Sequence, residues 1–162
     1  MKKFMTMTIA AMAFVMSMSS CSSSNDDAPE TPLATQVAGS YTGNEVIMVL
    51  GEESSNGTAK YEFAKSTDVS IDMTIPQSGE MDHMVIPALP VKGITLTKSG
   101  NTITGKMDSY AGTVTNASGD EKAYTISGLT VMFSDKTVVV IFSLKYGNMP
   151  MSMDTTFTGT KN

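Results

Sequence analysis

The sequence of 162 residues contains no tryptophan and no arginine, and it has only one cysteine and one histidine. A single cysteine excludes a disulfide framework, and one cysteine with one histidine excludes a zinc site of the usual Cys/His type. The lack of arginine and the excess of sixteen acids over eleven lysines argue against a nucleic-acid partner, because arginine reads phosphates and guanines. Charged residues make up only 17% of the chain, too few for a coiled coil or a charged disordered tail.

Residues 1–20 are typical of a secretory signal peptide. Lys2 and Lys3 give a positive start, and an uninterrupted apolar stretch follows at residues 9–16. This stretch is too short for a membrane-spanning helix, which needs about twenty apolar residues. We therefore expect residues 1–20 to direct export and then to be removed.

The only cysteine follows this stretch directly. Met18-Ser19-Ser20-Cys21 resembles the lipobox of bacterial lipoproteins. The resemblance implies that the Cys21 thiol carries a diacylglycerol, which makes the membrane a partner through this lipid anchor. Two or three acyl chains hold a protein stably on a membrane, whereas one chain holds it only marginally. The alternative is that Cys21 is merely a small residue at the end of an ordinary signal peptide.

Residues 21–36 are small, polar and proline-containing, which predicts a flexible tether before a folded domain at 37–162. Asp26 and Asp27 follow the cysteine closely and resemble the acidic export signal of some Gram-negative lipoproteins. This resemblance implies an outer-membrane lipoprotein exposed at the cell surface. The alternative is that both acids only solvate the tether. Removal of the signal leaves nine lysines and sixteen acids, and hence a net charge of −7.

The rest of the chain alternates between β-type runs and turn signals, at a spacing typical of a sandwich or barrel. The clearest period-two pattern is at residues 69–75, where Val69, Ile71, Met73 and Ile75 form an apolar set that should face a core. The expected strands cover residues 39–50, 58–64, 69–75, 92–97, 102–107, 110–114, 124–133, 138–144 and 149–158.

These strands predict an all-β fold, an antiparallel up-and-down meander of eight or nine strands. Closure into a barrel is favoured because it removes the exposed edges of an open sheet. No segment after residue 32 shows an apolar stripe of helical period. Two local features are also expected: a loop over 52–57 that closes on Asn56-Gly57, and a bulge or bend at Gly128.

The first expected strand carries a family resemblance. Gly39-Ser40-Tyr41-Thr42-Gly43 resembles the start of the calycin-like barrel domains of small Gram-negative envelope lipoproteins. It is also similar to the Gly-x-Trp opening of lipocalins, with Tyr41 in the aromatic position. Lipocalins pack an arginine of the last strand across that ring, and Lys161 is the nearby basic residue here. The resemblance implies an eight-stranded barrel that can hold a small ligand in its mouth.

Methionine is unusually frequent, and nine methionines remain after the signal is removed. Met149, Met151 and Met153 alternate along the last expected strand and should share one face. With Tyr41, they are the candidate contacts for a small apolar or amphipathic ligand, because methionine side chains adapt to loosely specified guests. The alternative is that these methionines simply fill the barrel interior.

Residues 80–84 combine sulfur with imidazole on an expected loop. Met81, His83 and Met84 offer two thioethers and the only histidine, and such soft ligands select Cu(I). We expect no cofactor, and copper is the alternative that these three residues leave open. The competing interpretation is an exposed loop or interior packing.

Catalytic signals are weak. The chain has no Gly-x-Ser-x-Gly elbow, and no cysteine is left after lipidation. We therefore expect a non-enzymatic envelope lipoprotein that binds a small ligand. The alternative is a structural or protein-interaction subunit whose barrel is filled by its own side chains.

Overall fold

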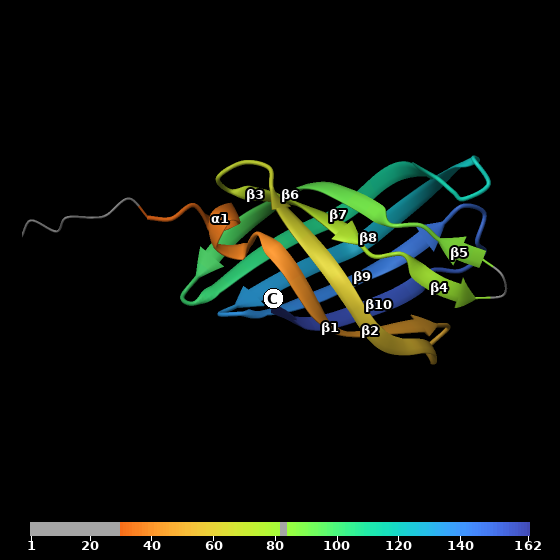
Figure 1. Cartoon of the computed structure of the whole chain (residues 1–162), viewed down its shortest axis with the longest axis horizontal. Coiled ribbons are helices and arrows are strands. Elements are labelled where there is room, and N and C mark those ends of the chain that lie inside the picture. Colours follow the sequence, from red (N-terminus) through yellow and green to blue (C-terminus); the bar gives the residue numbers. More distant parts are fainter. Residues whose placement is uncertain (1–29, 82–83) are drawn as a thin grey trace, which may run out of the picture. The chain divides into compact units, whose positions relative to one another are not determined.

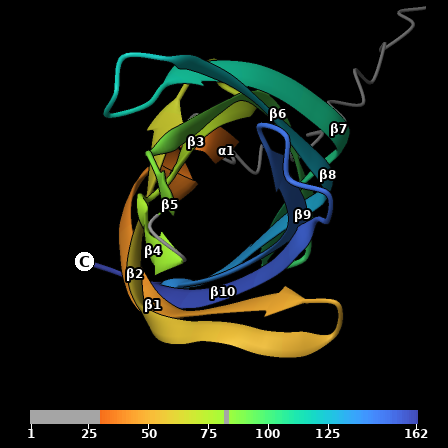
Figure 2. The same ribbon diagram turned by 90° about the vertical axis from the view of Figure 1, so that its right-hand side faces the viewer.

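The computed structural model describes residues 30–81 and 84–162. Within them, eight antiparallel strands close into a barrel in the order β1-β10-β9-β8-β7-β6-β3-β2 (Figures 1 and 2). The hairpin β4-β5 is inserted between β3 and β6. The predicted all-β meander closed into a barrel is confirmed. The elements are α1 (Leu33–Val37), β1 (Gly39–Val49), β2 (Glu52–Lys65), β3 (Ser70–Ile75), β4 (Ser78–Met81), β5 (Met84–Ile86), β6 (Leu89–Ser99), β7 (Thr102–Thr115), β8 (Glu121–Ser134), β9 (Thr137–Tyr146) and β10 (Met153–Lys161).

The two-residue period of the strands places one set of side chains inside the barrel. In β3, Ile71, Met73 and Ile75 are buried, as their alternation predicts. Val69 was expected to face the core with them, but it precedes the strand and its side chain is 53% exposed. Its carbonyl oxygen instead accepts a hydrogen bond from the Leu96 amide at 2.8 Å.

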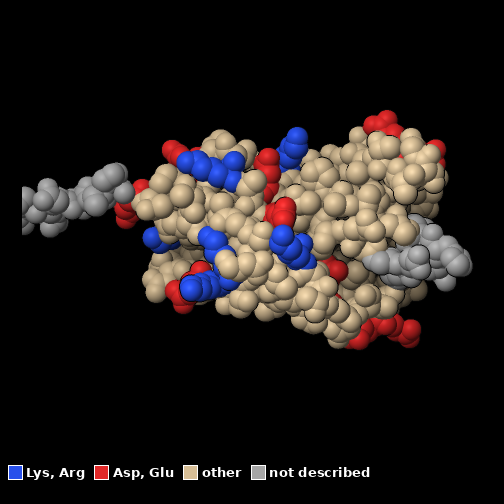
Figure 3. All heavy atoms as spheres, in the orientation of Figure 1, with Lys and Arg blue, Asp and Glu red and all other residues tan. Residues whose placement is uncertain are grey.

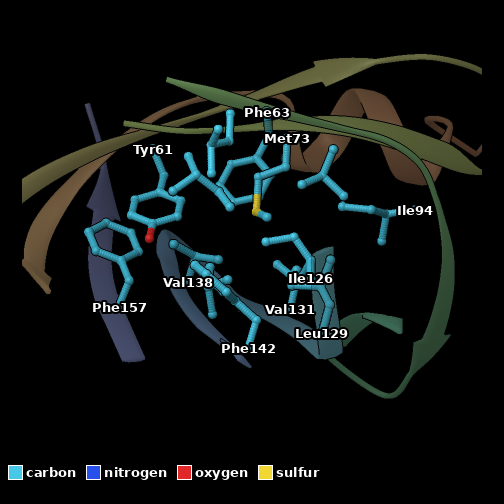
Figure 4. Packing of buried hydrophobic residues seen from close by; sticks show 14 of the residues in the cluster. Tyr61, Phe63, Met73, Ile94, Ile126, Leu129, Val131, Val138, Phe142 and Phe157 are labelled. Carbon is cyan, nitrogen blue, oxygen red and sulfur yellow. The ribbon is translucent and has the colours of Figure 1, made fainter. Parts of the chain in front are cut away.

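The middle of the barrel is filled by these inward side chains (Figure 4). Tyr61 stacks on Phe157, with 4.2 Å between ring centroids. Phe63 meets Phe133 nearly edge-on at 5.0 Å, and Tyr41 contacts both of these phenylalanine rings. The middle section is therefore a packed hydrophobic core, as is usual in eight-stranded barrels.

The loop predicted at residues 52–57 is wrong, because these residues are the beginning of β2. Asn56 and Gly57 pair with Val46 and Glu45 of β1. The chain reverses earlier, at Leu50 and Gly51, whose φ angles of +54° and +82° suit the tight turn of a two-residue hairpin. A leucine with positive φ is rare, so the sequence does not signal this turn.

Residues 102–115 form the single strand β7 rather than the two short strands expected. The alternation of apolar and polar residues along β7 is interrupted where its partner strand β8 bulges. The pairing of β8 with β9 shifts register between Ser127 and Thr130, and Gly128 has a φ of +62°. The bulge predicted at Gly128 is confirmed, and it explains why the apolar alternation of this strand pair changes phase.

The last strand also differs from the prediction. β10 begins at Met153, so Met149 and Met151 lie in the connection from β9 and do not share a strand face with it. Met153 is buried in the core, and Met151 is 40% exposed. Pro150 lies between Met149 and Met151 and has no amide hydrogen to donate to a ladder, which is consistent with the strand beginning only at Met153.

Helix α1 closes one end of the barrel, which we call the closed end (Figure 1). Its Ala34 and Val37 belong to the hydrophobic core, and the Tyr41 hydroxyl donates a hydrogen bond to the Val37 carbonyl at 3.0 Å. Residues 33–36 were expected to belong to the tether. Five helical residues are too few to show a helical period in the sequence. Among the described residues, no helix has the length and apolar character needed to cross a membrane.

Candidate ligand site at the open end of the barrel

The end of the barrel opposite α1 holds a pocket of about 800 Å³, which we call the mouth pocket. Figure 2 views this end of the barrel. Three segments that are distant in sequence line it: Val85 of β5, the β7-β8 turn with the first residues of β8, and the connection from β9 to β10. Pockets of this volume accommodate small organic ligands.

The β7-β8 turn has a defined backbone structure. The Asn116 side-chain oxygen accepts hydrogen bonds from the amides of Ser118 and Asp120, at 3.0 and 2.8 Å. The Asn116 amide in turn donates to the Asp120 carbonyl at 2.9 Å. An asparagine that bonds its own turn in this way fixes the loop conformation. This wall of the mouth pocket is therefore preformed.

The second wall is tied to the first by backbone hydrogen bonds. The Gly147 amide donates to the Ala123 carbonyl of β8 at 2.7 Å, and the Met149 amide donates to the Tyr146 carbonyl at 3.2 Å. Met149 is partly buried and packs against the hydrophobic core. The connection from β9 to β10 thus holds Met149 and Pro150 at the pocket while Tyr146 continues the interior of the barrel.

Tyr124 and Tyr146 are register partners on β8 and β9 and are both buried. The Tyr124 hydroxyl donates to the Pro90 carbonyl oxygen, and its ring lies 6.1 Å from that of Tyr110. Burial, together with the nearby Tyr110, raises the pKa of Tyr124 well above its ordinary value of 10.0. Tyr146 lines the mouth pocket, and burial raises the pKa of its hydroxyl as well. Both phenols therefore stay protonated and can donate hydrogen bonds.

The mouth pocket contains one lining residue of each charge, Glu121 and Lys122. The Lys122 ammonium also lies 3.8 Å from an Asp120 carboxylate oxygen, and both side chains are substantially exposed. On the face seen in Figure 3, the lysines lie in the half of the barrel near α1, together with several acids, whereas the charged side chains at the tips of the open end are acids. The open end therefore offers no concentrated positive charge on this face.

The structure separates the four residues that the sequence offered as ligand contacts. Met149 lines the mouth pocket, but Met151 does not. Met153 and Tyr41 are buried, and Tyr41 lies at the closed end, where its hydroxyl bonds α1. Sequence reasoning missed Tyr146 and the β7-β8 turn. The only available signal was that the turn is polar and glycine-containing, which identifies a loop but not a wall of a pocket.

Two of the three candidate copper ligands lie at paired positions of the β4-β5 hairpin. Met81 ends β4 and pairs in register with Met84, the first residue of β5, so these positions form a hairpin rather than an open loop. His83 lies outside the described residues, as do the lipidation candidate Cys21 and the export candidates Asp26 and Asp27. Copper binding, lipidation and export remain predictions.

Glu45 is an acid on the inward face of β1. Tyr61 donates a hydrogen bond to its carboxylate at 2.5 Å. Burial raises the pKa of Glu45 above its ordinary value of 4.5, although this hydrogen bond opposes the shift. The native state thus holds the proton more tightly than the unfolded chain does.

We predict that Glu45 makes the barrel less stable as the pH rises. An acid whose native pKa is raised contributes stability below its unfolded pKa, and this contribution is lost as the pH rises through the native value. The melting temperature of the wild type, relative to Glu45→Gln, should therefore fall from about pH 4 to about pH 7. Thermal unfolding followed by circular dichroism measures the difference, and a difference that is flat or grows with pH would contradict the prediction.

The comparisons with known proteins concern the fold. No protein-family model and no curated protein matches the chain. A crystal structure from Bacteroides fragilis, described as a "putative outer membrane protein", is similar to this chain, with a TM-score of 0.62 and 20% sequence identity. The similarity covers 81% of this chain and 53% of that chain, so it spans about half of the neighbour's length. This chain therefore shares its fold with part of that neighbour.

Proposed function

We propose that this chain is an anchored lipoprotein of the Gram-negative cell envelope whose barrel binds a small amphipathic ligand at its open end. The mouth pocket is the observation that carries the proposal. The middle of the barrel is packed with side chains and α1 closes the other end, whereas about 800 Å³ stays available at the mouth. Such a partly filled barrel can hold one small ligand.

The envelope location draws on two observations. The lipobox-like residues before Cys21 follow a signal-like stretch and precede a polar tether. The structural neighbour from Bacteroides fragilis is described as a "putative outer membrane protein", and the sequence identity with this chain is 20%. The acidic pair Asp26-Asp27 favours the outer face of the outer membrane as the destination.

The barrel is further proposed to be calycin-like. Lys161 of the last strand lies with its ammonium 6.0 Å from the centroid of the Tyr41 ring. The same ammonium donates a hydrogen bond to the Gln36 carbonyl at 3.1 Å. A basic residue of the last strand over the aromatic ring of the first is the arrangement that the lipocalin resemblance implies. In this chain the hydrogen bond from Lys161 to Gln36 also joins the end of β10 to α1.

The ligand would meet two kinds of surface. Met149, Pro150 and Val85 offer an apolar wall, and Asn116 and Asn148 offer polar groups. The proposal includes no reaction and no cofactor. The thioether of Met149 can adapt to ligands of different shapes.

We predict that Met149→Trp weakens ligand binding, because indole occupies part of the mouth pocket. The probe is the uncharged apolar fluorophore N-phenyl-1-naphthylamine, added to the full chain carrying Cys21→Ala so that no detergent is needed. Fluorescence titration should show a Kd at least roughly tenfold weaker for Met149→Trp. Met151→Trp is the matched control, since Met151 is exposed and does not line the pocket. Equal loss in both variants, or no binding by the parent, would refute binding at the mouth.

The packed interior favours a second candidate, a structural or protein-interaction subunit. The hydrophobic core continues from the closed end to Tyr146, so the side chains of the barrel itself fill this part of the interior. Cross-linking in intact envelopes tests this candidate: one defined protein adduct, together with no probe binding, would favour it over ligand binding.

A further inference from the structure

The Tyr146 hydroxyl is a buried polar group that has no hydrogen-bond partner among the described residues. The residue is only 4% exposed, and it is part of the lining of the mouth pocket. Nearly all buried hydroxyl groups in native proteins are paired, because an unsatisfied one loses its bonds to water. The register partner Tyr124 follows this rule, since its hydroxyl bonds the Pro90 carbonyl. Tyr146 belongs to the lining of the mouth pocket, so a ligand group that reaches its buried hydroxyl would complete the hydrogen bonding.

The charges around the mouth pocket disfavour a charged ligand. An anionic group would face Glu121 and the neighbouring Asp120, and a cationic group would face Lys122. The Lys122 charge is already partly balanced by the Asp120 carboxylate at 3.8 Å. The chain as a whole carries a net charge of −5, which adds a repulsive field for anions.

The uncharged polar residues of the pocket favour hydroxyl groups on the ligand. Ser118, Asn148 and Tyr146 have side chains that both donate and accept hydrogen bonds. The Asn116 side chain offers its amide nitrogen as a donor, because its oxygen already accepts from the Ser118 and Asp120 amides. A hydroxyl group of a ligand also donates and accepts hydrogen bonds. It can therefore accept from a lysine, donate to a carboxylate, or do either with a side-chain amide. Several hydroxyls held on one ring match such a mixed wall better than a single charged group does.

We infer that the mouth pocket binds an uncharged glycoside. The hydroxyl groups of the sugar contact Tyr146 and the polar β7-β8 turn, and the apolar aglycone packs against Met149 and Pro150. This inference rests on the proposed binding function and names the chemical class of its ligand. It also assigns a role to the Tyr146 hydroxyl, as a positioning group for the sugar head.

The test compares amphiphiles that have the same tail and different heads. Octyl glucoside, octyl sulfate and octylammonium are titrated calorimetrically into the full chain carrying Cys21→Ala, below their micelle-forming concentrations. We expect the glucoside to bind roughly tenfold more tightly than either charged amphiphile. Tyr146→Phe should weaken glucoside binding about threefold to tenfold without lowering the melting temperature, because it removes a hydroxyl that is unpaired in the free protein.

Tyr61→Phe is the matched control. It removes a hydroxyl that bonds Glu45 and does not line the mouth pocket, so glucoside affinity should stay unchanged. Charged heads that bind as tightly as glucose would overturn the inference and leave the proposed binding function in place. Unchanged glucoside affinity in Tyr146→Phe would overturn the role of this hydroxyl. A wild-type mouth that binds none of the three amphiphiles would overturn both proposals.

Discussion

Gly43→Ala should lower the free energy of unfolding by about 3 kcal/mol, the upper part of the usual range for overpacking. A Cβ atom at Gly43 would lie 2.0 Å from the Thr158 carbonyl oxygen and 2.4 Å from the Gly159 Cα. Both are backbone atoms of β10, so no side-chain rotation can relieve the contact. Gly43 and Gly159 are register partners at the seam that closes the barrel. The substitution therefore forces β1 and β10 apart.

Gly57→Ala is the matched control for this prediction. Gly57 lies on the neighbouring strand β2 opposite Glu45, and a Cβ there would meet nothing within 4 Å. Alanine also reduces the conformational entropy of the unfolded chain, so Gly57→Ala should be neutral or slightly stabilising. Thermal unfolding should show a melting temperature lower by roughly 10 °C for Gly43→Ala alone. Equal melting temperatures would mean that the seam is not closely packed at this point.

The strands of the barrel could be predicted because burial on one face leaves a two-residue period in the sequence. Ile71, Met73 and Ile75 show this directly, since their polar neighbours face outward. The turn between β1 and β2 could not be predicted in the same way. Asn56-Gly57 has the composition of a hairpin turn, but its backbone groups pair with β1, and an uncommon leucine conformation makes the turn instead.

The sequence predicted that a barrel of this kind can hold a ligand in its mouth, but it did not predict which residues line the mouth pocket. Its walls come from Val85, residues 116–123 and residues 146–150, which approach each other only when the strand lengths and registers are set. Met149 was among the predicted contacts for the wrong geometric reason, since it precedes β10 rather than lying on it. Tyr146 is one of five tyrosines in the sequence, and nothing local distinguishes the one that lacks a partner.

Cys21→Ala should move the whole protein from the membrane fraction to the soluble fraction. Each buried methylene of an acyl chain contributes about 0.8 kcal/mol to membrane binding, so two or three chains anchor stably and their loss is complete. Helix α1 and all the strands of the barrel lie within residues 31–162, and Cys21 is not one of these residues. The melting temperature of the barrel should therefore stay the same while the location changes. Fractionation of a Gram-negative host, followed by immunoblotting, measures the location.

Ser22→Ala is the matched control, since it changes the adjacent small residue and leaves the thiol in place. This variant should stay in the membrane fraction and keep the added mass of the acyl chains in intact-protein mass spectrometry. Cys21→Ala should lack that mass. If Cys21→Ala stays with the membrane, another part of the chain holds it there and the lipid anchor is wrong. If instead the wild type carries no acyl mass and is soluble, Cys21 is only the small residue at the end of a signal, and the mouth pocket belongs to a freely diffusing protein.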